Sequence, residues 1–423
     1  MTPASAGAAG WEQRVVSGMD THVYTPDALS PVGDGRGLLI VLHGCVQTAA
    51  QLRSLGNLEA AADGFGVVVA VPQVPNGGVY AGCWDYYGAN HSRDNRHNDD
   101  LLGLVDELSS EPGLAIDLDQ VYLSGFSSGG GQAIATGCLA PDVFAGVGIA
   151  AGPSLGTEAV EIGFVSTTSE AAAALCETLA GPASADFATQ LTAVHTGTFD
   201  FTVAQDYAQI NAEAFATRYG PGLTESPLDV ASLEGFEPAG EGTWWSDADG
   251  PRIAKMTITG ASHAWPAGSG AGGVTSFVEA KGVNYGWFLA EFFTMNNRRV
   301  EAPVEPGTTG DPTDTTGDDS SSGGTDGSTG GDTSGEPGTS SGEPTDDGSS
   351  TGDDSTEPTG APTGPGITGG GGGSSTDGAD LDEDLDGCCC RHDPRGGGAT
   401  GGLALMIFGL LTARGRRRSS PGR

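Results

Sequence analysis

The stretch Gln120-Val-Tyr-Leu-Ser-Gly-Phe-Ser127-Ser-Gly-Gly-Gly-Gln-Ala-Ile-Ala135 organises the rest of the chain. Residues 121–123 form a short apolar run that indicates a buried strand, and the small residues after the glycines indicate a helix. Between them, Gly125 to Gly129 fits the pattern G-x-S-x-G, in which a nucleophilic serine lies on a sharp strand-to-helix turn. The glycines are needed because side chains two positions either side of the serine would collide with neighbouring backbone.

The pattern alone is weak evidence, because the chain contains 72 glycines. It recurs at Gly338–Gly342 and Gly348–Gly352, in low-complexity sequence with no strand before it. It also occurs at Gly152–Gly156, after an apolar run, but no comparable helix of small residues follows there. We therefore predict Ser127 as the nucleophile and keep Ser154, or a serine in an ordinary glycine-rich turn, as alternatives.

Composition divides the 423 residues into four parts. We expect a flexible N-terminus over 1–10, a folded domain over 11–300, a linker over 301–387 and a separate C-terminal segment over 388–423. The linker has 21 acidic residues and no Lys or Arg. Such a segment buries too little apolar surface to offset chain entropy, so we predict that it is disordered.

The net charge of −37 argues against nucleic acid as a partner. The first ten residues lack the basic and apolar regions of a signal peptide, although Ala4-Ser-Ala6 resembles a cleavage site. One interpretation is a start assigned too far downstream of the true export signal. The other is a plain flexible N-terminus.

Apolar runs alternate with helical patterns through the folded part. The expected strands are Arg14–Tyr24 (an edge strand or hairpin), Gly37–Leu42, Gly66–Gln73, Val121–Leu123, Phe144–Ala151, Leu191–His195 and Arg252–Thr259. The expected helices are Ala49–Gly64, Asp99–Glu107 with Asn98 as its N-cap, Ala208–Arg218 and Tyr285–Met295. This alternation predicts an α/β fold with a doubly wound, mostly parallel sheet.

A nucleophilic serine needs a base and an acid that orients the base. His263 follows the strand expected over 252–259, and Asp200 follows the strand that ends at His195. Both therefore lie at the carboxyl ends of strands, where the active sites of such sheets gather. We predict His263 as the base and Asp200 as the acid. A surface-loop histidine is the alternative for the first, and Asp206 competes with the second.

The sequence offers two candidate oxyanion donors and no clear metal site. The turn His43-Gly44-Cys45 closes a central strand, so the amides of Cys45 and Ser128 could stabilise an oxyanion. No C-x-x-C pair has zinc spacing. The segment from His91 to Asp100 could bind a metal, but a solvated loop before a helix explains it better. We expect no metal and no cofactor.

Several ordered motifs between about Gly37 and Phe293 resemble the polyhydroxybutyrate-depolymerase family of esterases, which includes feruloyl and acetylxylan esterases. They are Leu42-His-Gly-Cys-Val-Gln47, Cys83-Trp84-Asp-Tyr, Asp117 to Gly129, Gly197-Thr-Phe-Asp-Phe-Thr-Val203 and His263-Ala-Trp-Pro266. The resemblance implies an α/β-hydrolase fold and a carboxylic-ester hydrolase. It places nucleophile, acid and base on Ser127, Asp200 and His263, and the oxyanion amides on Cys45 and Ser128.

The resemblance also places Trp84 in the substrate groove, and Trp265 is a second flat apolar surface expected beside the nucleophile. Core packing beside the active site is the alternative for both rings. Two disulfides are expected. Cys45 and Cys83 follow neighbouring parallel strands, and Cys138 and Cys176 bracket part of an unusual segment, Leu155–Ser184.

The C-terminus carries Cys388, Cys389 and Cys390, then the uncharged run Gly396–Ala413 and four arginines. Eighteen helical residues span about 27 Å, barely the thickness of a bilayer core. This arrangement resembles the myxobacterial C-terminal sorting tail, which implies anchoring at the cell surface. A glycine-rich terminus without such a role is the alternative.

Together these features predict an exported, surface-tethered, monomeric serine esterase that acts on a polymeric ester of the poly(3-hydroxybutyrate) type. A feruloyl or acetylxylan esterase is one alternative. A non-catalytic surface-binding domain with a hydrolase fold is another.

Overall fold

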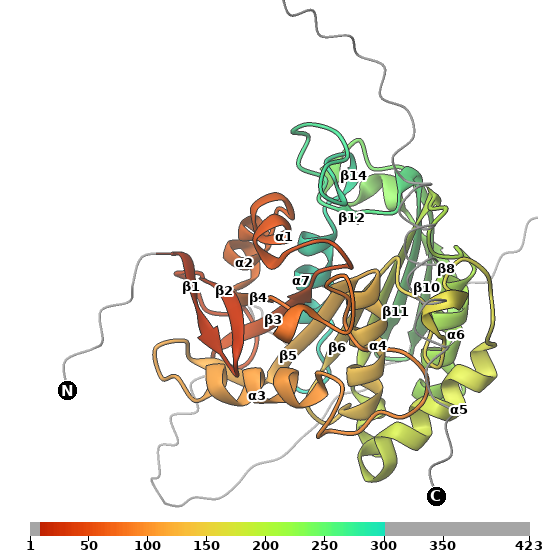
Figure 1. Ribbon diagram of the computed structural model, residues 1–423, viewed down its shortest axis with the longest axis horizontal. Coiled ribbons are helices and arrows are strands. Elements are labelled where there is room, and N and C mark those ends of the chain that lie inside the picture. The colour runs from red at the N-terminus through yellow and green to blue at the C-terminus, as the bar shows by residue number, and fades with distance from the viewer. Residues whose placement is uncertain (1–8, 301–423) are drawn as a thin grey trace, which may run out of the picture. The chain divides into compact units, whose positions relative to one another are not determined.

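The computed structural model describes residues 9–300 (Figure 1). Ten strands form one sheet in the order β1-β2-β4-β3-β5-β6-β7-β11-β10-β8. Their bounds are β1 Gly10–Val16, β2 Met19–Thr25, β3 Arg36–Leu42, β4 Val67–Pro72, β5 Ile116–Phe126, β6 Gly146–Ala150, β7 Leu191–Phe199, β8 Thr224–Leu228, β10 Gly240–Asp247 and β11 Gly250–Ser262. Two small pairs join β12 Trp265–Pro266 with β13 Val278–Glu279, and β9 Gly235–Phe236 with β14 Gly282–Val283.

Six central strands, β4, β3, β5, β6, β7 and β11, are parallel to their neighbours in this set. The hairpin β1–β2 borders them on one side, and the antiparallel strands β10 and β8 border them on the other. The central strands are buried on both faces, which explains why they are continuous apolar runs in the sequence.

Helices cover both faces of the sheet. They are α1 Ala49–Leu55, α2 Glu59–Phe65, α3 Asn98–Ser109, α4 Ser128–Leu139, α5 Ser169–Ala180, α6 Tyr207–Tyr219 and α7 Tyr285–Met295. Along β3, Leu38 and Ile40 pack in one core with α3 to α6, while Leu39 and Val41 pack in the other core with α1, α2 and α7. This period of two confirms the doubly wound prediction, and the arrangement is that of an α/β-hydrolase.

Two local predictions are wrong. The helix expected over Ala49–Gly64 is two helices, because α1 ends at the C-cap Gly56. Asn98 is not an N-cap: His97 holds that position with φ 64°, and Asn98 is the first residue of α3. The Asn98 side chain instead accepts hydrogen bonds from Gln132 and Thr136 of α4, at 2.9 and 2.7 Å. Helix α5 and strands β8 and β10 were not predicted.

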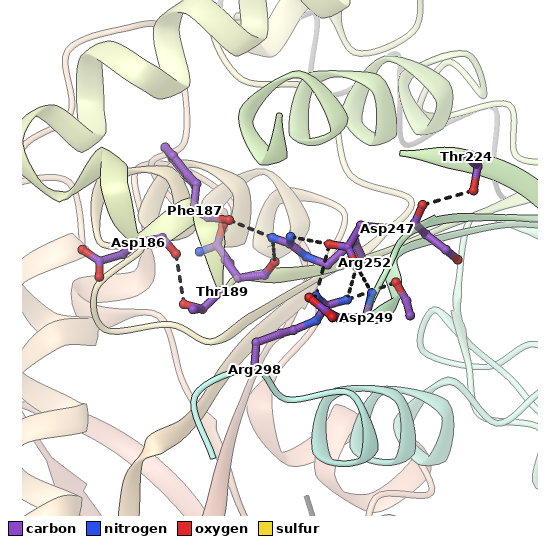
Figure 2. A network of polar contacts seen from close by, with 11 residues as sticks. Asp186, Phe187, Thr189, Thr224, Asp247, Asp249, Arg252 and Arg298 are labelled. Atoms are coloured by element: carbon purple, nitrogen blue, oxygen red, sulfur yellow. Dashed lines mark hydrogen bonds and ion pairs between the residues drawn. The ribbon is translucent and has the colours of Figure 1, made fainter. Parts of the chain in front are cut away.

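Arg252, Arg298 and Arg299, which we call the arginine clamp, join the last described residues to the amino ends of the parallel strands. Arg252, near the start of β11, and Arg298 both contact Asp247 at the end of β10 (Figure 2). Arg299 donates to the carbonyl oxygens of residues 141–144, before β6, and to Thr189, before β7. The last described residues are therefore attached at the end of the sheet where the parallel strands begin.

The structure contains both expected disulfides, Cys45–Cys83 and Cys138–Cys176. Among residues 9–300, none of the helices combines the length and apolar character needed to cross a membrane. The predicted acidic linker, the cysteine cluster and the C-terminal apolar run lie outside the described residues, as does most of the predicted flexible N-terminus.

Candidate active site

Three polar side chains meet at the carboxyl ends of three parallel strands. Ser127 follows β5, Asp200 follows β7 and His263 follows β11. The His263 Nε2 is 2.9 Å from the Ser127 Oγ, and its Nδ1 is 2.8 Å from the Asp200 Oδ2. The structure therefore brings together the three residues that the sequence singled out, in the order of contact that a Ser-His-Asp triad requires.

The turn that carries Ser127 is strained and tightly packed. Ser127 has φ 55° and ψ −116°, which is rare for a residue with a side chain. A Cβ on Gly125 would lie 2.2 Å from the Gly129 carbonyl oxygen, and a Cβ on Gly129 would lie 2.6 Å from the Leu42 carbonyl oxygen. Both glycines of the motif are thus required by close backbone contacts, as the sequence indicated.

Asp200 is held from several directions and is only 3% exposed. Its Oδ1 accepts hydrogen bonds from the amides of Thr202 and Val203, at 2.9 and 3.0 Å. Burial by itself would raise the pKa of this carboxyl, but the charge and hydrogen bond of His263 and the two amides lower it below its ordinary value. Asp200 is therefore ionised at neutral pH and can orient the His263 ring.

The competing residues lie elsewhere. Ser154 is buried in the loop after β6, and its Oγ has no hydrogen-bond partner among the described residues. His195 lies inside β7, fully buried, and burial lowers its pKa to about 4. Asp206 is the N-cap residue of α6.

The amides expected to bind an oxyanion border the same cavity as Ser127. Cys45 and Ser128 both line it, and within residues 9–300 neither amide donates a hydrogen bond to another protein group. Gly44 makes this approach possible, since a Cβ there would lie 2.8 Å from the Phe126 ring. Two unpaired N–H groups beside a serine form a suitable site for a developing negative charge.

Residues that sequence reasoning did not assign hold this turn in place. The His43 Nδ1 donates to the Gly44 carbonyl oxygen at 2.8 Å, and its Nε2 accepts the amide of Val74 at 3.1 Å. Burial lowers the pKa of His43 to about 4, although the bond to Gly44 opposes the shift, so the ring is neutral. The Gln47 Oε1 accepts the Gly44 amide at 3.0 Å. The motif His-Gly-Cys-Val-Gln contained this signal, because a buried His and Gln near a strand end need partners.

The tryptophans occupy a different environment from the one predicted. Trp84 and Trp265 are 0% exposed and do not line the cavity. The Trp84 Nε1 donates to the His43 carbonyl oxygen at 3.0 Å, and the Trp265 Nε1 donates to the Gly56 carbonyl oxygen at 3.2 Å. The prediction that both rings form a surface beside the nucleophile is wrong, because each indole is used inside the core to satisfy a backbone carbonyl.

Other aromatic residues line the cavity instead, and its volume is about 350 Å³. They are Tyr80, Tyr86, Tyr87, Phe126 and Phe277, with apolar residues from the loops over 153–162 and 202–203. The Tyr80 and Tyr87 rings are stacked with centroids 6.3 Å apart. A mostly apolar cavity with few polar groups beside a serine suits an uncharged organic ligand.

The segment that could have held a metal has other partners. The His91 Nε2 donates to the Tyr86 carbonyl oxygen, and the His97 Nδ1 accepts the Asp85 amide. Within residues 9–300, no group of three or more His, Cys, Asp and Glu side chains is close enough to hold a metal ion.

This chain is similar to known esterases and depolymerases. Residues 24–195 match the family described as Esterase PHB depolymerase. The poly(3-hydroxybutyrate) depolymerase of Ralstonia pickettii is 38% identical over 315 residues, which cover 70% of this chain and 63% of that relative. This chain thus spans less than two thirds of that relative's length.

Two further proteins show a more distant similarity. Feruloyl esterase B of Neurospora crassa is 30% identical over 29% of this chain and 40% of its own length. The solved acetyl xylan esterase of Aspergillus awamori is 19% identical, with a TM-score of 0.47, over 61% of this chain and 94% of its own. By its match over residues 24–195, this chain is similar to the esterase PHB depolymerase family.

Proposed function

We propose that this protein is a serine carboxylic-ester hydrolase that cleaves a polymeric ester of the poly(3-hydroxybutyrate) type through an acyl-enzyme. The observation that carries the proposal is the pair of contacts from His263, 2.9 Å to the Ser127 Oγ and 2.8 Å to the Asp200 Oδ2, beside an apolar cavity. The 38% identity to a poly(3-hydroxybutyrate) depolymerase supports the choice of substrate class.

In the first half of the reaction, the Ser127 Oγ attacks the ester carbonyl carbon while the His263 Nε2 takes its proton. The carbonyl oxygen becomes an oxyanion and accepts hydrogen bonds from the amides of Cys45 and Ser128. The tetrahedral intermediate then collapses. His263 gives its proton to the departing alcohol oxygen, and the acyl group remains on Ser127.

In the second half, His263 takes a proton from water, and the resulting hydroxide attacks the acyl carbon. The same two amides stabilise the second oxyanion, and His263 returns the proton to the Ser127 Oγ as the carboxylic acid leaves. Ionised Asp200 keeps Nδ1 protonated and stabilises the positive ring throughout, which leaves Nε2 free to act as the base.

Hydrolysis of p-nitrophenyl butyrate, blocked by a serine-directed phosphonate, tests the activity. Absence of turnover in the folded, disulfide-bonded protein would favour the alternative of a non-catalytic binding domain. A panel of poly(3-hydroxybutyrate), feruloyl and acetyl-xylan esters tests the substrate class. Faster turnover of a feruloyl or acetyl-xylan ester than of the polyester would favour the alternative that the similarity to feruloyl esterase B suggests.

We also propose that the protein is exported and held at the cell surface by its C-terminal segment. Two disulfides in the folded domain support export, since such bonds persist in oxidising compartments. Anchoring rests on the sequence of residues 388–423 alone. Deleting these residues should release active enzyme into the medium with unchanged turnover of a soluble ester. Full-length protein in the cytoplasm with all cysteines reduced would contradict both parts of this proposal.

A further inference from the structure

Several exposed apolar side chains lie on the loops that line the active-site cavity. Six of them, which we call the rim patch, lie on loops that also contribute cavity-lining residues: Val46, Phe164, Val165, Phe199, Phe201 and Val274. Val46 follows the lining residue Cys45, and Phe201 precedes the lining residue Thr202. Large apolar side chains that cluster in this way commonly mark an interaction site.

The two phenylalanines of the rim patch contribute little to the packing of the core. Phe199 is 58% exposed and Phe201 is 85% exposed, and their rings are stacked with centroids 6.3 Å apart. Asp200 between them is buried and held by His263 and by the amides of residues 202 and 203. Neither aromatic ring is among the groups that fix the carboxylate, and both rings are too exposed to be explained by core packing.

The loops around the rim patch carry few charged residues, which indicates the charge of a partner that could bind there. The loops over 44–48, 78–82, 157–168, 198–205 and 269–278 contain no Lys or Arg. Their acidic residues are the buried Asp200 and the pair Glu158 and Glu161, which cap one short turn together. An anionic lipid surface attracts basic residues, which these loops lack. A neutral apolar surface fits them.

The rim patch also lies at the free end of the sheet. The arginine clamp attaches residues 298 and 299 beside the amino ends of β6, β7 and β11. Phe199 and Phe201 of the rim patch lie at the carboxyl end of β7, the opposite end of that strand. The described chain therefore ends at the opposite side of the sheet from the cavity mouth.

We propose that the rim patch is a docking surface for an insoluble, neutral polyester, which places the cavity mouth against the polymer. This inference rests on the proposed function and adds to it the means by which the enzyme meets a solid substrate. Phe199 and Phe201 contribute most of the contact, because they are the largest and most exposed members of the patch. They provide the exposed aromatic surface that was expected from Trp84 and Trp265.

Adsorption to a poly(3-hydroxybutyrate) film tests the proposal with the full-length chain. Ser127→Ala is introduced throughout, so that the film is not degraded during the measurement. The double change Phe199→Ser/Phe201→Ser should raise the half-saturating protein concentration by about tenfold or more, the equivalent of losing part of the burial of two aromatic rings. The matched control Val15→Ser/Leu118→Ser removes two side chains that are 61% exposed elsewhere and should change it less than about twofold.

A second measurement separates this proposal from the proposed function. With Ser127 intact, the Phe199→Ser/Phe201→Ser protein should hydrolyse p-nitrophenyl butyrate at the wild-type rate but degrade the film more slowly. Unchanged adsorption, or an equal loss on film and soluble ester, would overturn the docking proposal while leaving the esterase in place. Phenylalanine-dependent binding to anionic vesicles instead of the film, or phenylalanine-dependent dimers in light scattering, would overturn it in favour of another partner.

Discussion

The two ends of the parallel strands use polar groups in opposite ways. At the carboxyl ends, Ser127 has a strained backbone, and the amides of Cys45 and Ser128, residues that line the cavity, have no protein partners within residues 9–300. At the amino ends, Arg298 and Arg299 make several hydrogen bonds to carboxylate, hydroxyl and carbonyl oxygens. One end keeps polar groups available for a substrate, and the other uses them to close the fold.

Because of this difference, activity and stability should respond separately to changes at the two ends. Groups at the carboxyl ends gain their full set of interactions only when a reacting ester is present. At the amino ends, Arg298 and Arg299 already have hydrogen-bond partners, so removing either arginine takes a donor away from those partners. Each prediction below tests this separation.

The largest effect is expected from Ser127→Ala. Turnover of p-nitrophenyl butyrate should fall by about 10⁶-fold, as for other triads that act as a unit. The midpoint of thermal unfolding should stay unchanged, because the Oγ contributes to the reaction and not to the core. Ser154→Ala is the matched control from the second G-x-S-x-G pattern and should keep wild-type turnover. The opposite outcome for the two variants would show that the wrong turn had been chosen.

The two disulfides provide a paired test, because each closes a loop with a sequence separation of 38. In the chain-entropy model, either bond contributes about 4 kcal/mol to the free energy of unfolding. Cys45→Ala/Cys83→Ala and Cys138→Ala/Cys176→Ala should therefore lower that free energy by similar amounts in denaturant titrations.

Activity should distinguish the two pairs. Cys45 lines the active-site cavity and carries one of the two amides proposed to bind the oxyanion, whereas neither Cys138 nor Cys176 lines the cavity. Loss of one oxyanion donor typically costs about 10²–10³ in turnover, which sets the upper bound for the first pair. The second pair should keep the wild-type kcat per folded molecule. Equal kcat for both double variants would contradict the assigned role of the Cys45 turn.

At the amino ends, Arg299→Ala should lower the free energy of unfolding by about 2 kcal/mol, since it leaves several carbonyl oxygens without donors. The kcat should not change. Arg93→Ala is the control: Arg93 also contacts the segment near Asp142, but as an exposed ion pair, so its loss should cost less than about 1 kcal/mol. Chemical unfolding of both variants checks this, and a drop in kcat for Arg299→Ala would contradict the separation of the two ends.

The smallest effect concerns pH. His43 and His195 have pKa values lowered to about 4 by burial, against an ordinary value of 6.5. Between these limits the unfolded chain binds protons that the folded chain does not, so stability is full above pH 6.5 and falls as the pH drops toward 4. Going from pH 7.0 to 5.5 should cost about 1 kcal/mol for each such histidine.

His195→Leu isolates one of these histidines, since both its ring nitrogens lack partners within the described residues. The variant should lose about 1 kcal/mol less than the wild type over the same pH step, measured by urea unfolding at both pH values. Asp247 in the arginine clamp should not contribute to this pH dependence. Burial would raise its pKa, but hydrogen bonds from Arg298 and Arg252 lower it below its ordinary value, so the carboxylate stays ionised over this pH step. An identical pH dependence in the two proteins would show that His195 is not buried in its neutral form.

Much of the fold could be predicted because its signals are local. The buried strands β3 and β4 are continuous apolar runs, and each candidate triad residue directly follows a strand. Parallel strands place the residues that follow them at one edge of the sheet. The positions of Ser127, Asp200 and His263 after such strands were therefore enough to predict that they lie close together.

What could not be predicted depends on the direction of side chains. Nothing local shows that Trp84 and Trp265 bond inward to backbone carbonyls, or that Asn98 turns toward α4 instead of capping α3. Phe199 and Phe201 lie beyond the strand expected over Leu191–His195, and they are exposed where β7 ends and the chain leaves the sheet at Asp200. Such outcomes follow from tertiary packing, which a single sequence does not display.

The central claim is that Ser127 forms the covalent intermediate, and a phosphonate adduct tests it most directly. The full-length protein is treated with a p-nitrophenyl phosphonate ester, digested, and mapped by mass spectrometry. One adduct should appear, on the peptide that contains Ser127, and it should be absent from His263→Ala, in which the serine lacks its base. An adduct on the peptide that contains Ser154, or no adduct in an enzyme that hydrolyses p-nitrophenyl butyrate, would contradict the account.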